Sequence, residues 1–147
     1  APEKEPEVLN HYGFASFPDG QLRTTATDYA EVLKLMINRG KVNGATFLSE
    51  KTIDAYLEIQ YPDVAKHQAI TWNYNEFNAF DYIFFMPRYM FTRKLPAHSG
   101  YDPGVETYVV FDPKKKRGAI IFINSPLIEW WGVRIYHVMI KKLIKEG

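Results

Sequence analysis

The chain of 147 residues contains no cysteine, which excludes disulfide bonds, thiolate metal sites and a cysteine nucleophile. It has no apolar run of about 18 residues, so no transmembrane span is expected. An excess of charge of one sign is also missing, because 18 Lys and Arg residues face 17 Asp and Glu residues and leave a net charge of +1. This balance argues against nucleic acid as a partner.

The first residues lack both an initiator Met and the apolar stretch of a signal peptide, since residues 1–7 are charged and proline-rich. We therefore expect a processed or truncated chain. Residues 1–22 show no hydrophobic periodicity and contain several Pro and Gly residues, so they are predicted to form an irregular lead-in segment. The length suits one compact domain over residues 1–147, which would bury about 68–70% of its unfolded surface.

Two helices are predicted in the first half of the chain. The first covers about residues 26–39, where apolar side chains recur at helical spacing, with Thr25 as N-cap and Gly40 as the stop. Its apolar stripe is predicted to pack into the core. The second begins after the N-cap Ser49 and runs to about residue 58, ahead of a proline that cannot continue a helix.

From residue 68 onward the sequence is rich in β-branched and aromatic residues, which favour strands. Strands are predicted at residues 69–72, 82–86, 105–111 and 119–123. A charged hairpin turn joins the last two, and its basic residues are expected to be solvated rather than to bind phosphate. Ser125 is predicted to cap a final helix that covers the sheet. The expected fold is α+β: an antiparallel sheet with a C-terminal helix packed on it, preceded by two helices.

One stretch of the sequence is typical of a chemical site. His98-Ser99-Gly100 lies between apolar runs that indicate strands, and Asp102-Pro103-Gly104 follows it as a turn signal. Because Gly100 has no Cβ, a substrate could lie close against the backbone there. We therefore expect a His and a Ser on a strand that ends in a tight turn.

Four stretches, in order along the chain, resemble the C-terminal half of the serine β-lactamases and DD-peptidase-like hydrolases, especially the class C β-lactamase and esterase branch. They are Phe17 to Asp28, Gly40 to Gly44 with Leu48-Ser49, His98 to Gly104, and Phe111-Asp112-Pro113 followed by Ile123-Asn124. Together they span nearly the whole chain. The resemblance implies a partial β-lactamase or transpeptidase fold and a periplasmic or exported protein.

The mechanism of that family implies roles for the strand motif. A serine in a Ser-x-x-Lys helix forms an acyl-enzyme with a lactam, peptide or ester, a Tyr-x-Asn loop helps to move the proton, and a Lys-Thr-Gly or His-x-Gly strand walls the cleft. His98 is thereby implied to be catalytic as a polar group facing the substrate or the proton of the tyrosine. Tyr101 is implied to be catalytic through its backbone N–H, as an oxyanion donor. Ser99 and Gly100 are implied to bind the substrate, and no cofactor or metal is implied.

The family's nucleophile and tyrosine loop are missing from this chain. No serine is followed three residues later by a lysine, and no Tyr-x-Asn occurs. The chain is therefore expected to be inactive alone, with its nucleophile in an upstream part of the same protein. Because a fragment of this fold would expose an apolar sheet face or a strand edge, the expected partners are the missing N-terminal part or a second copy, besides a small-molecule or peptide substrate.

Two other hypotheses remain open. The chain could be a non-catalytic binding or interaction module whose aromatic patch is formed by Trp72, Tyr74, Phe77 and Tyr101. A metal site is the weaker hypothesis, because no two of the 4 histidines have ligand spacing on one element. The histidines are His11, His67, His98 and His137.

Overall fold

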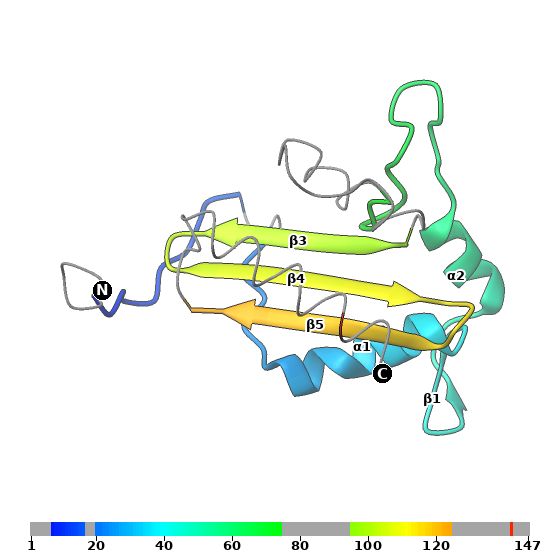
Figure 1. Ribbon diagram of the computed structural model, residues 1–147, viewed down its shortest axis with the longest axis horizontal. Coiled ribbons are helices and arrows are strands. Elements are labelled where there is room, and N and C mark those ends of the chain that lie inside the picture. Colours follow the sequence, from blue (N-terminus) through cyan, green and yellow to red (C-terminus); the bar gives the residue numbers. More distant parts are fainter. Residues whose placement is uncertain (1–6, 17–19, 75–94, 125–141, 143–147) are drawn as a thin grey trace.

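The computed structural model describes residues 7–16, 20–74, 95–124 and 142 of the chain. Within them the fold is mixed α+β, with two helices and two antiparallel sheets (Figure 1). The helices are α1 (Ala26–Ile37) and α2 (Glu50–Leu57), and the strands are β1 (Lys41–Val42), β2 (Ala45–Thr46), β3 (Ala97–Asp102), β4 (Val105–Asp112) and β5 (Arg117–Ile123). Residues 7–16 and 20–22, the described part of the lead-in segment, form neither helix nor strand, as predicted.

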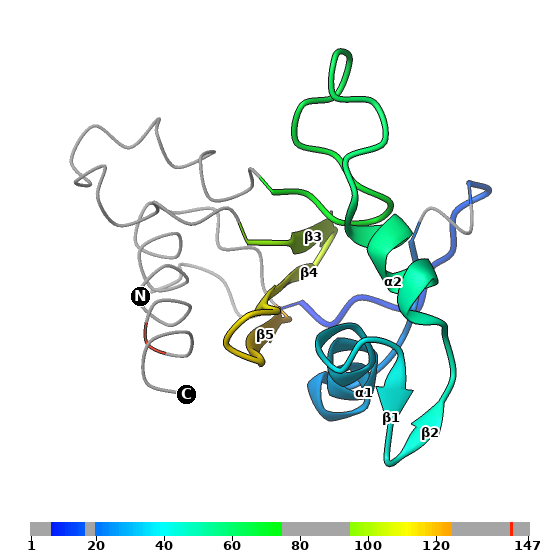
Figure 2. The ribbon, with the colours of Figure 1, turned by 90° about the vertical axis from the view of Figure 1, so that its right-hand side faces the viewer.

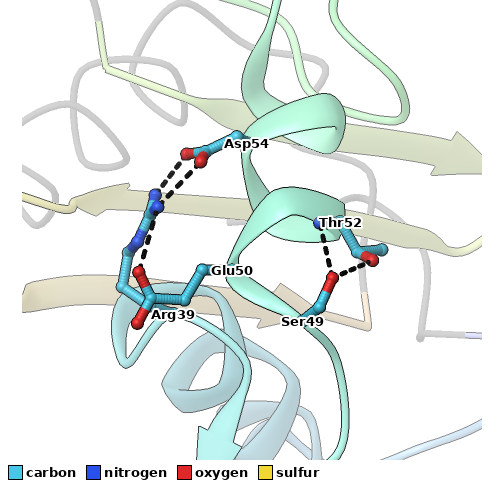
Figure 3. A network of polar contacts seen from close by, with 5 residues as sticks. All are labelled: Arg39, Ser49, Glu50, Thr52 and Asp54. Atoms are coloured by element: carbon cyan, nitrogen blue, oxygen red, sulfur yellow. Dashed lines mark hydrogen bonds and ion pairs between the residues drawn. The ribbon is translucent and has the colours of Figure 1, made fainter.

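Both helices begin where the sequence predicted. Thr25 Oγ1 accepts a hydrogen bond from the Asp28 backbone N–H at 3.1 Å. Ser49 Oγ accepts one from the Thr52 backbone N–H, also at 3.1 Å (Figure 3). Each bond satisfies one of the backbone donors that a helix N-terminus leaves without an intrahelical partner. At the other end, α1 stops at Ile37, slightly before its predicted end.

The early end of α1 results from a Schellman motif. The Gly40 N–H donates to the Leu35 carbonyl at 2.8 Å and the Arg39 N–H to the Met36 carbonyl at 3.3 Å, the two bonds that define this motif. Arg39 has a φ of 57° and Gly40 a φ of 90°, so the left-handed conformation begins one residue before the glycine. A Cβ on Gly40 would collide with the Leu48 carbonyl, which explains why glycine follows the arginine.

Arg39 also joins the end of α1 to α2. Its guanidinium donates to both carboxylate oxygens of Asp54, at 2.5 and 2.9 Å, and lies 3.6 Å from a carboxylate oxygen of Glu50 (Figure 3). The hydrogen bond from Arg39 lowers the pKa of Asp54 below its usual value. Because all three side chains are exposed, this ion pair is of the kind that contributes little to stability.

The three-stranded sheet has the order β3, β4, β5, and both neighbouring pairs are antiparallel. One face packs on α1 and α2, which Figure 2 shows on the same side of the sheet. The buried residues on this side are Leu33, Met36, Ile37, Ile53, Ala69, Trp72, Val109 and Phe111, and those of the other cluster are Leu95, Ala97, Tyr108, Val110, Ala119 and Ile121. Since β4 contributes to both clusters, it is the buried central strand. The predicted hairpin of strands 105–111 and 119–123 is confirmed.

The close approach of α1 to β5 depends on Gly118. A Cβ at this position would lie 2.6 Å from Leu33 Cδ2 on α1 and 2.7 Å from the Val110 carbonyl oxygen on β4. Both distances are shorter than a carbon atom can occupy without displacing its neighbours. The absence of a side chain at Gly118 therefore lets the helix pack on this strand.

The predicted strand at residues 69–72 is wrong. These residues form a tight turn in which the Ala69 N–H donates to the Trp72 carbonyl at 2.8 Å, and the only β pairing is in isolated bridges, at Ala69 and at Gln68 and Asn73 beside the turn. Their apolar and β-branched composition favours a strand, but Ala69 and Trp72 are buried in the core while Ile70 between them is exposed. Burial of the two flanking side chains, rather than β propensity, decides the local structure.

The predicted strand at 82–86 lies outside the described residues, and so does the predicted helix after Ser125 except for Lys142, which is helical. The packing of a C-terminal helix on the sheet therefore stays a prediction. Among the residues that the structure describes, no helix is long and apolar enough to cross a membrane.

Candidate functional site

The His98-Ser99-Gly100 motif lies on β3, at the edge of the three-stranded sheet. Within the described strands, β3 pairs with β4 alone (Figure 1). All residues from His98 to Tyr101 are exposed, and Tyr101 exposes 67% of its surface. Pro103 and Gly104 then form the predicted tight turn into β4, with Gly104 at a φ of 80°. The prediction of a His and a Ser on a strand that ends in a turn is confirmed.

The register of β3 on β4 separates the candidate side chains onto two faces. His98 lies opposite Val109, whose side chain belongs to the cluster under α1 and α2. Ser99 lies opposite Tyr108, which belongs to the cluster on the other face. Because side chains alternate along a strand, Tyr101 shares the face of Ser99 and not that of His98. The structure therefore does not bring the side chains of His98 and Tyr101 together.

Backbone groups of β3 also alternate between β4 and the open edge. The Ala97 N–H and carbonyl pair with Asn73, at 3.0 and 2.7 Å, on the side away from β4, whereas the Pro96 carbonyl accepts from the Phe111 N–H of β4 at 3.2 Å. The register continues without interruption to the end of the strand. The Tyr101 N–H therefore points to the same side as that of Ala97, toward the edge, because this direction repeats every second residue. This is the orientation that an oxyanion donor on β3 needs.

His98 is held by the turn at residues 69–72. Its Nδ1 lies 2.7 Å from the Thr71 carbonyl oxygen. A carbonyl can only accept a hydrogen bond, so this contact assigns the proton to Nδ1. In the neutral ring, Nε2 is then an acceptor. The neutral imidazole of this exposed residue thus keeps the lone pair of Nε2 as an acceptor.

Gly100 has a steric reason to lack a side chain. A Cβ at this position would lie 2.8 Å from Thr107 Oγ1, directly across on β4. Any larger residue at this position would have to displace the side chain of Thr107. The absence of a Cβ, which the sequence suggested for substrate approach, therefore also serves the packing of β3 on β4.

The lead-in segment packs against the turn at the far end of β3, a feature that sequence reasoning missed. The Tyr12 hydroxyl donates to the Pro103 carbonyl at 2.8 Å, and Arg23 Nη2 donates to the Tyr12 carbonyl at 2.6 Å. Arg23 Nη1 also contacts His11 Nδ1. Figure 1 shows this segment passing the end of β3 where the turn into β4 lies. No motif indicates the contact, because Tyr12 and Pro103 are far apart in the sequence.

The predicted aromatic patch does not form as a surface. Trp72 exposes only 3% of its area and stacks edge-on against Phe111, with ring centroids 4.9 Å apart. Tyr74 is half-buried, which raises its pKa, and its hydroxyl donates to the Leu57 carbonyl at 2.7 Å. Among the described members of the predicted patch only Tyr101 is exposed, and Phe77 lies outside the described residues. The prediction was wrong for Trp72 because its indole fills the core beside β4.

The described histidines, His11, His67 and His98, do not come together into a metal site. His11 contacts Arg23 and His98 contacts Thr71, while His137 lies outside the described residues. In the part of the chain that the structure describes, no group of three or more His, Cys, Asp or Glu side chains could hold a metal ion.

Comparisons of the chain with protein-family models, with curated proteins and with solved structures gave no match. The function must therefore be inferred from the residues and from the geometry of β3.

Proposed function

We propose that this chain is the C-terminal portion of a serine hydrolase related to the β-lactamases and DD-peptidases, and that β3 is one wall of its substrate cleft. The observation that carries the proposal is the His98-Ser99-Gly100 motif on an exposed edge strand, with the Tyr101 N–H directed toward that edge. The reaction is hydrolysis of a lactam, peptide or ester through an acyl-enzyme. A periplasmic or exported location belongs to the same proposal.

Each residue of the motif has a role in this reaction. A carbonyl that is attacked by a serine develops negative charge on its oxygen, and the Tyr101 N–H is one donor to that oxyanion. The second donor and the serine itself would come from an upstream Ser-x-x-Lys segment. His98 Nε2 accepts a hydrogen bond in the cleft, and the Ser99 hydroxyl bonds a carboxylate of the substrate. Gly100 lets the substrate backbone approach β3 closely.

The proposal is tested on the complete natural protein with a fluorescent β-lactam or phosphonate probe that labels an activated serine, followed by mass spectrometry. We expect the label on a serine upstream of Ala1, within Ser-x-x-Lys. His98→Ala is expected to slow labelling by about 10²- to 10³-fold, in the range found when one polar group is removed from such a site. Ser16→Ala, away from the motif, is the control and should label at the normal rate. A natural protein without Ser-x-x-Lys upstream would refute the proposal.

The exposure of Tyr101 supports a second candidate function, a binding module without catalysis. An extended peptide can add to a sheet edge through main-chain hydrogen bonds, and side chains on the edge strand then give specificity. On this alternative, the chain binds a peptide or a second copy of itself, Tyr101→Ala weakens that binding, and no serine is labelled. Labelling of the natural protein would exclude it.

A further inference from the structure

The turn beside His98 contains a strained residue. Thr71 has a φ of 62°, in the left-handed region. Among the described residues other than glycine with a positive φ, it is the one with a β-branched side chain, since the others are Gln21, Arg39, Asn43 and Lys116. A branched Cβ makes this conformation costly, and such residues persist only where the surrounding structure imposes them.

Several contacts impose this conformation on Thr71. The Ala69 N–H donates to the Trp72 carbonyl at 2.8 Å and closes a two-residue loop around Ile70 and Thr71. The Gln68 side-chain amide donates to the carbonyls of Ala69 and Trp72, at 2.8 and 3.2 Å. Trp72 is anchored in the core against β4. The turn is therefore fixed from both sides, and Thr71 has a φ in it that Gly or Asn adopts more readily.

The turn is also fixed relative to β3. Asn73, immediately after it, exchanges two backbone hydrogen bonds with Ala97, the first residue of β3 and the neighbour of His98. The carbonyl oxygen of Thr71, the residue with the strained φ, then lies 2.7 Å from His98 Nδ1. Within the described chain this is the contact that orients the exposed imidazole.

We propose that Thr71 is a positioning residue for His98. Its carbonyl, aimed by the left-handed turn, keeps the proton on Nδ1 and leaves Nε2 as the acceptor at the β3 edge. In a fully solvated imidazole no protein group fixes which nitrogen carries the proton. A hydrogen bond from one ring nitrogen to a protein acceptor fixes the proton on that nitrogen and leaves the other free to act. The catalytic meaning of this tautomer rests on the proposed hydrolase function. There, Nε2 selects substrates that present an N–H or O–H donor opposite β3.

The inference is tested by long-range proton–nitrogen NMR correlation on the full ¹⁵N-labelled chain, which reports the nitrogen that carries the His98 proton. The signal is assigned by its loss in His98→Gln, and we expect the proton on Nδ1. Thr71→Gly, which adopts the same φ without strain, is the matched control and should keep this tautomer. Thr71→Pro fixes φ near −65° and should turn the carbonyl away, so that the proton distributes over both nitrogens.

A proton on Nε2 in the unmodified chain would overturn the inference without any variant, so the test does not depend on whether Thr71→Pro folds. A folded Thr71→Pro chain that keeps the proton on Nδ1 would also overturn it. In the complete natural protein, Thr71→Pro is expected to slow serine labelling by about 10- to 100-fold, as loss of a group that orients a functional histidine does. An Nδ1 proton together with no labelled serine would leave the positioning role intact and remove the hydrolase function. A labelled serine together with a proton on Nε2 would support the hydrolase function and refute the positioning role of Thr71.

Discussion

Two tight turns flank β3, and they reach a similar backbone conformation with different residues. The turn into β4 has Gly104 at a φ of 80°, whereas the turn that pairs with the start of β3 has Thr71 at a φ of 62°. Glycine adopts such a φ freely, but a β-branched residue does so at a cost of about 1–3 kcal/mol. The Pro103 carbonyl in the first turn holds Tyr12 of the lead-in segment, and the Thr71 carbonyl in the second holds His98. The strained turn is the one beside the candidate functional side chain.

Both turn carbonyls accept a hydrogen bond from a distant side chain, but the Thr71 carbonyl is the one that holds the candidate functional side chain. Strain in a folded protein is often found where it serves the positioning of a side chain. At Gly104 a Cβ would lie 2.8 Å from Cδ1 of the exposed Leu9, the end of a side chain that can move, so the main requirement for glycine there is the positive φ. At Thr71 the requirement is a hydrogen bond from the exposed His98 to the backbone carbonyl.

The largest effect is expected from moving the strain into the unstrained turn with Gly104→Thr. This variant imposes a left-handed β-branched residue and pushes against Leu9, so we expect the free energy of unfolding to fall by about 2–3 kcal/mol. The measurement is urea denaturation at equilibrium. Gly44→Thr is the matched control, because Gly44 also has a φ of 80° but no atom within 4 Å of a Cβ. It isolates the strain, so Gly104→Thr should be the more destabilised of the two.

The reverse exchange, Thr71→Gly, is expected to raise the free energy of unfolding by about 0.5–1 kcal/mol. The relief of strain exceeds the extra backbone entropy that glycine adds to the unfolded chain. Thr46→Gly on β2 is the control, since Thr46 is exposed and has no positive φ, and only the entropy loss is expected there. Destabilisation by Thr71→Gly equal to that of Thr46→Gly would show that Thr71 is not strained.

Sequence reasoning recovered the elements whose signals are local. Thr25 and Ser49 are side-chain caps with a fixed spacing to the N–H that they accept from, so both helix starts were predictable. The β4–β5 hairpin was predictable from alternation and from its charged turn, and Asp112 indeed accepts from two backbone N–H groups of that turn.

The rest depended on contacts between distant residues. Trp72 has strand propensity, but its burial against Phe111 turns the chain instead. The site showed the same division: the position of His98 on a strand followed from its neighbours, while its contact with Thr71 joins residues 27 positions apart. No pattern in a single sequence indicates that the carbonyl of residue 71 will face a histidine on β3.

The smallest effect concerns Arg39, another left-handed residue, whose side chain pairs with Asp54 rather than with the candidate site. The pKa of Asp54 is lowered in the folded chain from its ordinary value of 3.8. A carboxylate of this kind stabilises the fold above its unfolded pKa, and the contribution is lost as pH falls through the lower folded pKa. Wild type should therefore exceed Asp54→Asn slightly in Tm near neutral pH, and the difference should shrink as the pH falls below the ordinary Asp pKa of 3.8. Thr71→Gly, which removes no charge, should show a Tm difference that is constant over this range. If the Asp54→Asn difference were equally constant, the Arg39 ion pair would contribute nothing, and its left-handed φ would serve only to end α1.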